Sequence, residues 1–204
     1  MNTALDCVPC FVRQAVEAVS MVVPESGRRE TLLRKLLQEI SMADWQGSPP
    51  AMGQKIHRLI RREIGAADPY LRIKRQMNQA AQTLLPQLRE AMRDQADPQE
   101  AAVRIAIGGN LLDAGAKTQI AIEDLPRHMQ RIWNKPLQGD VCALFEAAEV
   151  ARSILYLTDN AGEIFFDRVL IEALPAGKVT VAVRGHPVIN DATREDAIEI
   201  GRAS

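Results

Sequence analysis

Apolar residues recur at helical spacing through most of the first two thirds of the chain. The stretches with this i, i+3, i+4 pattern, which predicts amphipathic helices, are 32–40, 56–64, 71–92 and 101–107. Asp68-Pro69 is a helix-start signal before the third of them. Gly108-Gly109-Asn110 breaks the spacing after the fourth and predicts that the helix is interrupted there.

The hydrophobic period changes after about residue 138. The elements predicted beyond this point are a helix over 141–151, a strand over 153–158, a helix over 162–174, a strand over 178–184 and a helix over 193–201. The first strand is an unbroken apolar run, which is typical of a parallel strand covered on both faces. We therefore predict an α+β or α/β fold, with a helical subdomain over 1–137 and a Rossmann-like parallel α/β subdomain over 138–204.

The predicted sheet has two strands, fewer than an open sheet usually has. The sequence ends at Ser204, within the helix expected to cross over to a further strand. We therefore expect the α/β part to be incomplete as given and to come from a longer protein. Without further strands, the exposed strand edge would favour pairing with a second copy, so a homo-oligomer is possible.

Composition narrows the classes of partner. Lys and Arg number 25 and Asp and Glu 26, so the net charge of -1 gives no overall field that favours nucleic acid or an anionic membrane. Aromatic residues make up only 4%, which argues against a base-stacking surface. Apolar runs are far shorter than the roughly 20 residues that span a bilayer, and no secretory leader pattern precedes Cys7. We expect a cytoplasmic protein that binds neither nucleic acid nor membrane.

Polar side chains follow both predicted strands, at the edge where ligands of parallel sheets bind. Asp159 and Asn160 follow the first strand and offer two hard oxygen ligands that suit Mg²⁺ or Mn²⁺. The small Ala161 and Gly162 would let backbone N–H groups approach a phosphate. Asp191 follows the second strand, and because neighbouring strands lie about 4.8 Å apart, it could share the cation.

The same residues also have a plainer structural interpretation. Asp159 and Asn160 could cap the helix that follows them. Asp191 or Thr193 could cap the last helix, and Asn190 could form an Asx turn. Nucleotide-binding loops lose support, because neither G-x-x-x-x-G-K-[ST] nor G-x-G-x-x-G follows the first strand. The residues alone therefore leave metal binding and helix capping open.

Several motifs occur in an order that covers nearly the whole chain. They are Cys7-x-x-Cys10-x-x-Arg13, Asp68-Pro69-Tyr70-x-x-x-Lys74-x-x-x-Asn78, Gly109-Asn110-x-x-Asp113, Asp159-Asn160-Ala161-Gly162-Glu163 and Arg184-Gly185-x-Pro187-x-x-Asn190-Asp191-Ala192-Thr193-x-x-Asp196-Ala197. This ordered set resembles the damage-control phosphatase family, formerly domain of unknown function 89. The short prokaryotic branch with an N-terminal Cys pair is the most similar. The family's later Gly-Ser/Pro-Gly-Thr and Lys-Gly-x-Gly-Asn loops, which contact substrate phosphate, have no match in this sequence.

The resemblance implies a metal-dependent phosphatase of small phosphorylated metabolites, either sugar phosphates or damaged phosphometabolites. The family's metal ligands match Asp159, Asn160 and Asp191, and the expected cation is Mn²⁺, Co²⁺, Ni²⁺ or Mg²⁺. Glu163 would order the attacking water or the outer shell of the metal. The candidate substrate contacts are Lys74, Asn78, Asn110, Asp113 and Arg184.

Two other functions stay open: a non-catalytic protein that binds phosphorylated metabolites, and a methyltransferase. Cys7 and Cys10 have the spacing of half a zinc site or of a redox pair, or they occupy a helix start, and their role stays open. His186 lies beside the predicted site, where it is either a proton-transfer group or an exposed loop residue.

Overall fold

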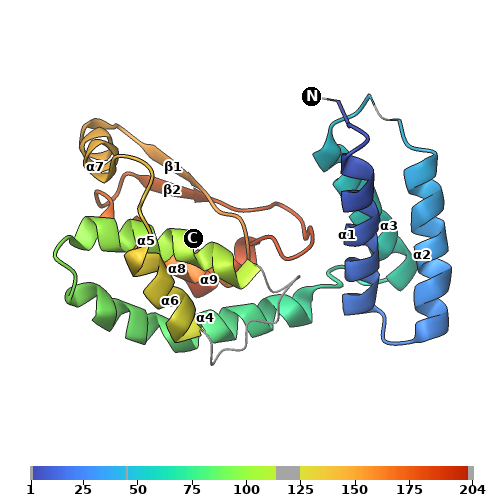
Figure 1. Cartoon of the computed structure of the whole chain (residues 1–204), viewed down its shortest axis with the longest axis horizontal. Helices are drawn as coiled ribbons and strands as arrows, with labels where there is room; N and C mark the ends of the chain where they lie inside the picture. The colour runs from blue at the N-terminus through green and yellow to red at the C-terminus, as the bar shows by residue number, and fades with distance from the viewer. Residues whose placement is uncertain (1, 45, 114–124, 202–204) are drawn as a thin grey trace. The chain divides into compact units, whose positions relative to one another are not determined.

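The computed structural model of the chain describes residues 2–44, 46–113 and 125–201, and for 111–113 and 125–129 it describes the backbone alone. In chain order its elements are α1 (Cys7–Val22), α2 (Ser26–Ser41), α3 (Pro49–Ile64), α4 (Leu71–Arg93), α5 (Pro98–Asp113), α6 (Leu125–Asn134), α7 (Val141–Val150), β1 (Ile154–Leu157), α8 (Glu163–Ala173), β2 (Val179–Ala182) and α9 (Arg194–Glu199) (Figure 1). No helix within these described ranges is long and apolar enough to cross a lipid bilayer. The chain forms two compact units: Met1–Arg72 with Pro187–Ile189, and Ile73–His186 with Asn190–Ser204.

The first unit contains α1, α2 and α3, which pack against one another. Leu32 and Leu36 of α2 are buried at i, i+4 spacing, and so are Ile56 and Ile60 of α3. These positions confirm the two stripes predicted for this part of the chain. α3 is followed by Gly65 with φ of 73°, the left-handed conformation in which glycine commonly ends a helix.

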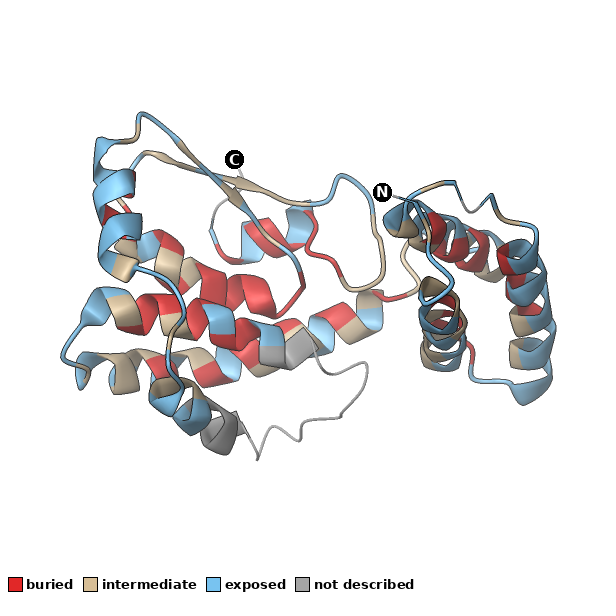
Figure 2. Ribbon diagram, turned by 45° about the horizontal axis from the view of Figure 1, so that its top comes forward, coloured by how far each residue is buried: buried red, intermediate tan, exposed pale blue. Residues whose placement is uncertain are grey.

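The second unit packs its helices around a core to which α8 contributes most. α5 and α8 lie side by side (Figure 1), and α8 is buried over most of its length (Figure 2). β1 and β2 form a parallel pair in which Ile154 is opposite Val179 and Leu157 is opposite Ala182. Both strands were predicted, and the helices with a small parallel sheet confirm the α+β or α/β fold class.

The division into units differs from the predicted boundary between 1–137 and 138–204. α4 and α5 belong to the second unit, because their apolar faces pack against α8. Ala81 of α4, Ile105 of α5 and Phe166 of α8 share one buried cluster. Periodicity identifies the face of a helix that is buried, but not the element that buries it.

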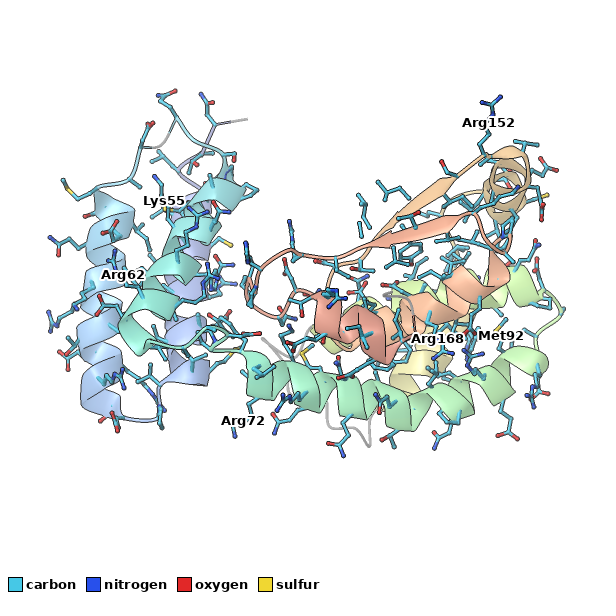
Figure 3. All side chains as sticks on the ribbon, turned by 180° about the vertical axis from the view of Figure 1, so that it is seen from behind. Lys55, Arg62, Arg72, Met92, Arg152 and Arg168 are labelled. Carbon is cyan, nitrogen blue, oxygen red and sulfur yellow. The ribbon has the colours of Figure 1, made fainter. Side chains whose placement is uncertain are left out.

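Polar contacts at the surface also join α4 to α8. Arg89 and Arg168 both pair with Glu172, at 2.5 and 2.6 Å. All three side chains are partly exposed, so solvent screening leaves each pair with little net effect on stability. Met92 of α4, labelled in Figure 3, packs on the buried cluster of the second unit.

The predicted interruption at Gly108-Gly109 is wrong, because α5 continues through both glycines to Asp113. A Cβ atom at Gly109 would lie 2.9 Å from Glu163 Cγ and 3.1 Å from Phe166 Cδ2. Glycine inside a helix is disfavoured by about 1 kcal/mol relative to alanine, but here it lets α5 approach α8 closely. The glycine therefore marks a helix contact where the sequence predicted a break.

The prediction that the first strand is covered on both faces is also wrong for the described residues. β1 alternates between half-buried and exposed positions, with Leu155 65% and Leu157 71% exposed. Ile154 and Tyr156, on the other face, pack against a cluster around Phe145 of α7. Figure 2 accordingly shows both strands in tan and pale blue, so the described elements cover only one face of this sheet.

Candidate active site

The turn after β1 and the segment after β2 are joined by their backbones. Asn160 and Asp191 are paired in an antiparallel bridge, and Ala192 N–H donates to the Asp159 carbonyl oxygen at 2.7 Å. Directly opposed residues of an antiparallel pair project their side chains to the same face. The three predicted metal ligands therefore lie in two segments that touch, and Asn160 and Asp191 share one face.

Arg184 forms an ion pair with Asp191. Its Nε donates to Asp191 Oδ2 at 2.6 Å, and its backbone N–H donates to the Ala192 carbonyl oxygen at 2.9 Å. The Arg184 side chain is 63% exposed and that of Asp191 is 11% exposed. The ion pair thus holds a largely buried carboxylate beside a guanidinium that solvent and ligands can reach.

Glu163 joins two of the predicted asparagines. It is 5% exposed, at the first turn of α8, and it accepts from Asn110 Nδ2 at 2.7 Å and from Asn160 Nδ2 at 3.3 Å. An amide carries its nitrogen and its oxygen on opposite sides of the carbon, so Asn160 Oδ1 is turned away from Glu163. Glu163 therefore fixes the orientation of the amide oxygen predicted to bind a cation.

Lys74 and Asn78, predicted as substrate contacts, are buried on α4, and the substrate role remains a prediction. Lys74 Nζ donates to Asp196 Oδ2 at 3.1 Å and to Thr193 Oγ1 at 3.0 Å. Asn78 Oδ1 accepts from Gly162 N–H at 2.7 Å. Burial alone would raise the pKa of Asp196, but bonds from Thr193 and Asn78, with the charge of Lys74, leave that pKa below its ordinary value.

The structure tests the alternative that some of these residues cap helices. Thr193 is the N-cap of α9 and forms a capping box, with its N–H donating to Asp196 Oδ2 at 2.7 Å. This confirms one capping prediction. The N-cap residue of α8 is Gly162, which has no side chain, so neither Asp159 nor Asn160 occupies the N-cap position.

Sequence analysis missed one buried polar pair near the site. Tyr156 O–H donates to Asp167 Oδ1 at 2.7 Å, and Asp167 is 5% exposed, one turn beyond Glu163 on α8. Burial is the main cause that raises the pKa of Asp167 to about 6; the Tyr156 bond opposes this shift and the charge of Asp159 adds to it. The signal available in the sequence was a carboxylate directly after the apolar run 164–166 of α8.

The structure does not bring the other predicted residues together around Asn160 and Asp191. The Asp113 side chain lies outside the described residues. Cys7, Cys10 and Cys142 are free thiols, and His186 is exposed, as its plainer interpretation predicts. Within the described ranges, no group of three or more His, Cys, Asp or Glu side chains is placed to hold a metal, so the candidate ligand set depends on the Asn160 amide.

The fold and the site define an α+β protein with an oxygen-rich site beyond the carboxyl ends of two parallel strands. The chain belongs to the damage-control phosphatase ARMT1-like domain family, whose sequence model matches residues 3–202. This match confirms the resemblance found from the motifs.

Three relatives and one solved structure illustrate the match. The chain is 31% identical over 203 residues to an uncharacterized protein of Methanocaldococcus jannaschii, covering 94% of this chain and 65% of that protein. It is 36% identical over 150 residues to a damage-control phosphatase of Archaeoglobus fulgidus, covering 72% of this chain and 51% of that protein. A damage-control phosphatase of Pyrococcus horikoshii is 28% identical over 206 residues, covering 98% of this chain and 70% of that protein. The crystal structure of a DUF89 family protein from Pyrococcus horikoshii superposes with a TM-score of 0.84 at 28% identity, covering 98% of this chain and 70% of that one.

The chain spans about half to two thirds of the length of the first two of these relatives.

Proposed function

We propose that this protein hydrolyses phosphate monoesters of small phosphorylated metabolites, with a divalent cation held by Asp159, Asn160 and Asp191. The observation that carries the proposal is the backbone bridge between Asn160 and Asp191, which brings the ends of both strands together. Family membership supports the reaction class, since two of the relatives are named damage-control phosphatases.

The residues present fit a hard divalent cation. The set consists of two carboxylates and one amide oxygen, which suit Mg²⁺ or Mn²⁺, and Co²⁺ or Ni²⁺ are further candidates. The hydrogen bond from Asn160 Nδ2 to Glu163 turns the amide oxygen of Asn160 away from the helix. When bound, such a cation neutralises phosphoryl oxygens and lowers the pKa of a bound water.

The chain's own residues have separable roles in this proposal. The exposed guanidinium of Arg184 would pair with the substrate phosphate, since guanidinium–phosphate hydrogen bonds are among the strongest in proteins. Glu163 would hold the Asn110 and Asn160 amides in place. The free thiols Cys7 and Cys10 are consistent with a reducing compartment, and we include a cytoplasmic location in the proposal.

Phosphate release tests the proposal. We expect release from some members of a panel of sugar phosphates when Mn²⁺, Co²⁺, Ni²⁺ or Mg²⁺ is present, and none with a chelator. Asp159→Ala and Asp191→Ala should each lower this activity by at least about 100-fold, because each removes an anionic ligand. Asp140→Ala, which alters the N-cap of α7, is the matched control and should keep the activity. Calorimetric metal binding that survives both ligand changes would refute the site.

A non-catalytic phosphometabolite-binding protein is the second candidate, since an ion pair like Arg184–Asp191 would also serve binding alone. Saturable binding of a sugar phosphate without phosphate release, under every metal, would favour it. The methyltransferase alternative loses support, because the chain belongs to a phosphatase family.

A further inference from the structure

Helix α4 supports the turn Asp159–Gly162 directly. Gly162 has φ of 80°, and a Cβ atom there would lie 3.0 Å from Met77 Cβ and 3.1 Å from the Met77 carbonyl oxygen. A residue with a side chain would be strained by the left-handed backbone and would clash with the helix. The turn that carries two predicted metal ligands therefore rests on the backbone of α4.

Asn78 bonds to both segments of the candidate site. Its Oδ1 accepts from Gly162 N–H at 2.7 Å, and its Nδ2 donates to Asp196 Oδ1 at 2.9 Å and to Glu199 Oε2 at 3.0 Å. Gly162 belongs to the turn after β1, whereas Asp196 and Glu199 belong to the helix that follows Asp191. One amide therefore connects the two halves that supply the predicted ligands.

Lys74 makes a second connection one helical turn earlier on α4. Residues four apart lie on the same face of a helix, so Lys74 and Asn78 face α9 together. Lys74 is 2% exposed and Asn78 is 4% exposed. Lys74 Nζ bonds Thr193 Oγ1, two residues after Asp191, as well as Asp196 Oδ2. The Asp191 segment is thus fixed to the same helix as the turn.

We propose that Asn78 is a positioning residue for this site: together with the backbone bridge between Asn160 and Asp191, it holds the turn with Asp159 and Asn160 in place against the segment with Asp191. The inference rests on the proposed function, and it differs from a substrate contact because Asn78 acts through Gly162 and Asp196 from a buried position. Gly162 is two residues from Asn160, so a shift of its amide displaces the ligand pair. Sites of this kind require ligand positions correct to about 0.5 Å.

Two substitutions test this role. Asn78→Ala removes both connections. Asn78→Asp keeps an acceptor for Gly162 N–H but places a carboxylate against Asp196 and Glu199. We expect each to weaken Mn²⁺ binding by about 10-fold or more, as loss of groups that orient metal ligands commonly does. In Asn78→Ala, hydrogen exchange at the Gly162 amide should also be at least about 10-fold faster, since that N–H loses its acceptor.

The matched control is Leu88→Ala, another buried change on α4 that lies away from the turn. All variants are compared on the full chain at 10 °C, after melting curves confirm that they are folded. The control should lose thermal stability and yet keep the Mn²⁺ dissociation constant and Gly162 exchange within about twofold of wild type. A substrate contact would instead raise KM for the sugar phosphate and leave Mn²⁺ affinity unchanged.

Three results would overturn the inference. The first is Mn²⁺ affinity of Asn78→Ala within twofold of wild type. The second is an equal loss of affinity in Leu88→Ala, which would show a general effect of instability. The third is an unchanged exchange rate at Gly162. If wild-type protein itself fails to bind Mn²⁺, the proposed function fails along with the metal part of the inference, while Gly162 exchange still decides whether Asn78 holds the turn.

Discussion

Acid should weaken the first unit through a single buried histidine. His57 of α3 is 3% exposed, and its Nδ1 lies 2.9 Å from the Tyr70 hydroxyl. Its Nε2 is buried with no hydrogen-bond partner among the described residues. Burial, together with the smaller effect of the Arg61 charge, lowers the pKa of His57 to about 4. Protonation would therefore bury a charge beside a cation, in a ring whose Nε2–H has no acceptor among the described residues.

The sign and size of the effect follow from these pKa values. The unfolded chain binds a proton at His57 near pH 6.5, whereas the folded chain does so near pH 4. Between these values the unfolded state binds more protons, so the free energy of unfolding falls as pH falls. The difference of about 2.5 pKa units corresponds to roughly 3 kcal/mol once both states are protonated, and to about 2 kcal/mol at pH 5. This contribution is fully present only above about pH 6.5.

Two measurements test this prediction. An NMR titration of the His57 ring should place its pKa near 4. Urea unfolding, followed by hydrogen exchange at buried amides of α3, should show stability rising between pH 4.5 and 6.5. His57→Asn keeps a partner for the Tyr70 hydroxyl without titrating, so it should flatten this slope, whereas His186→Asn, at an exposed position, should not. A ring pKa near 6.5, or an unchanged slope in His57→Asn, would refute the reasoning.

Two further predictions concern the second unit. Gly109→Ala should destabilise this unit by about 1–3 kcal/mol in urea unfolding, because the added Cβ would lie 2.9 Å from Glu163 Cγ. The control Gly27→Ala, with open space around the added Cβ, should be neutral or slightly stabilising. Equal effects at both glycines would disprove the close approach of α5 to α8. Asp167→Asn should raise the free energy of unfolding of the metal-free protein by up to about 3 kcal/mol at pH 7.5 and by little at pH 4. The reason is that a carboxyl whose pKa is raised to about 6 destabilises the fold as pH rises from about 4 to 6. Thermal melting at both pH values checks this, and a gain that persists at pH 4 would contradict it.

Local sequence patterns were enough to predict the helices and strands named below and the edge of the sheet where the candidate site lies. The apolar stripes predicted the buried faces of α2 and α3, and the change of period predicted β1, α8 and β2. The strand ends also brought Asn160 and Asp191 together, because the carboxyl ends of parallel strands meet at one edge. Each of these inferences needs only the pattern of neighbouring residues.

Contacts between segments far apart in the sequence could not be predicted from such local patterns. Gly109 looks like a helix break unless Glu163 is known to pack on it, and the assignment of α4 to the second unit depends on a core shared with α8. Leu155 and Leu157 look like core residues until the sheet is seen with one uncovered face. In each case the outcome depends on which distant segments pack against one another, and a single sequence does not contain that information.

The same distinction explains why the roles of Lys74 and Asn78 could not be read from their motif. A lysine and an asparagine four residues apart on a helix are equally suited to hold a phosphate or to hold a protein segment. Their side chains are almost fully buried, and their bonds to Asp196 and Gly162 require neither solvent nor ligand. Burying a lysine costs several kcal/mol unless it is paired, so a substitution that removed Asp196 would remove the carboxylate that lies 3.1 Å from Lys74 Nζ. The candidate site therefore depends on a polar network that no ligand needs to touch, and variants of that network should alter metal affinity before they alter substrate recognition.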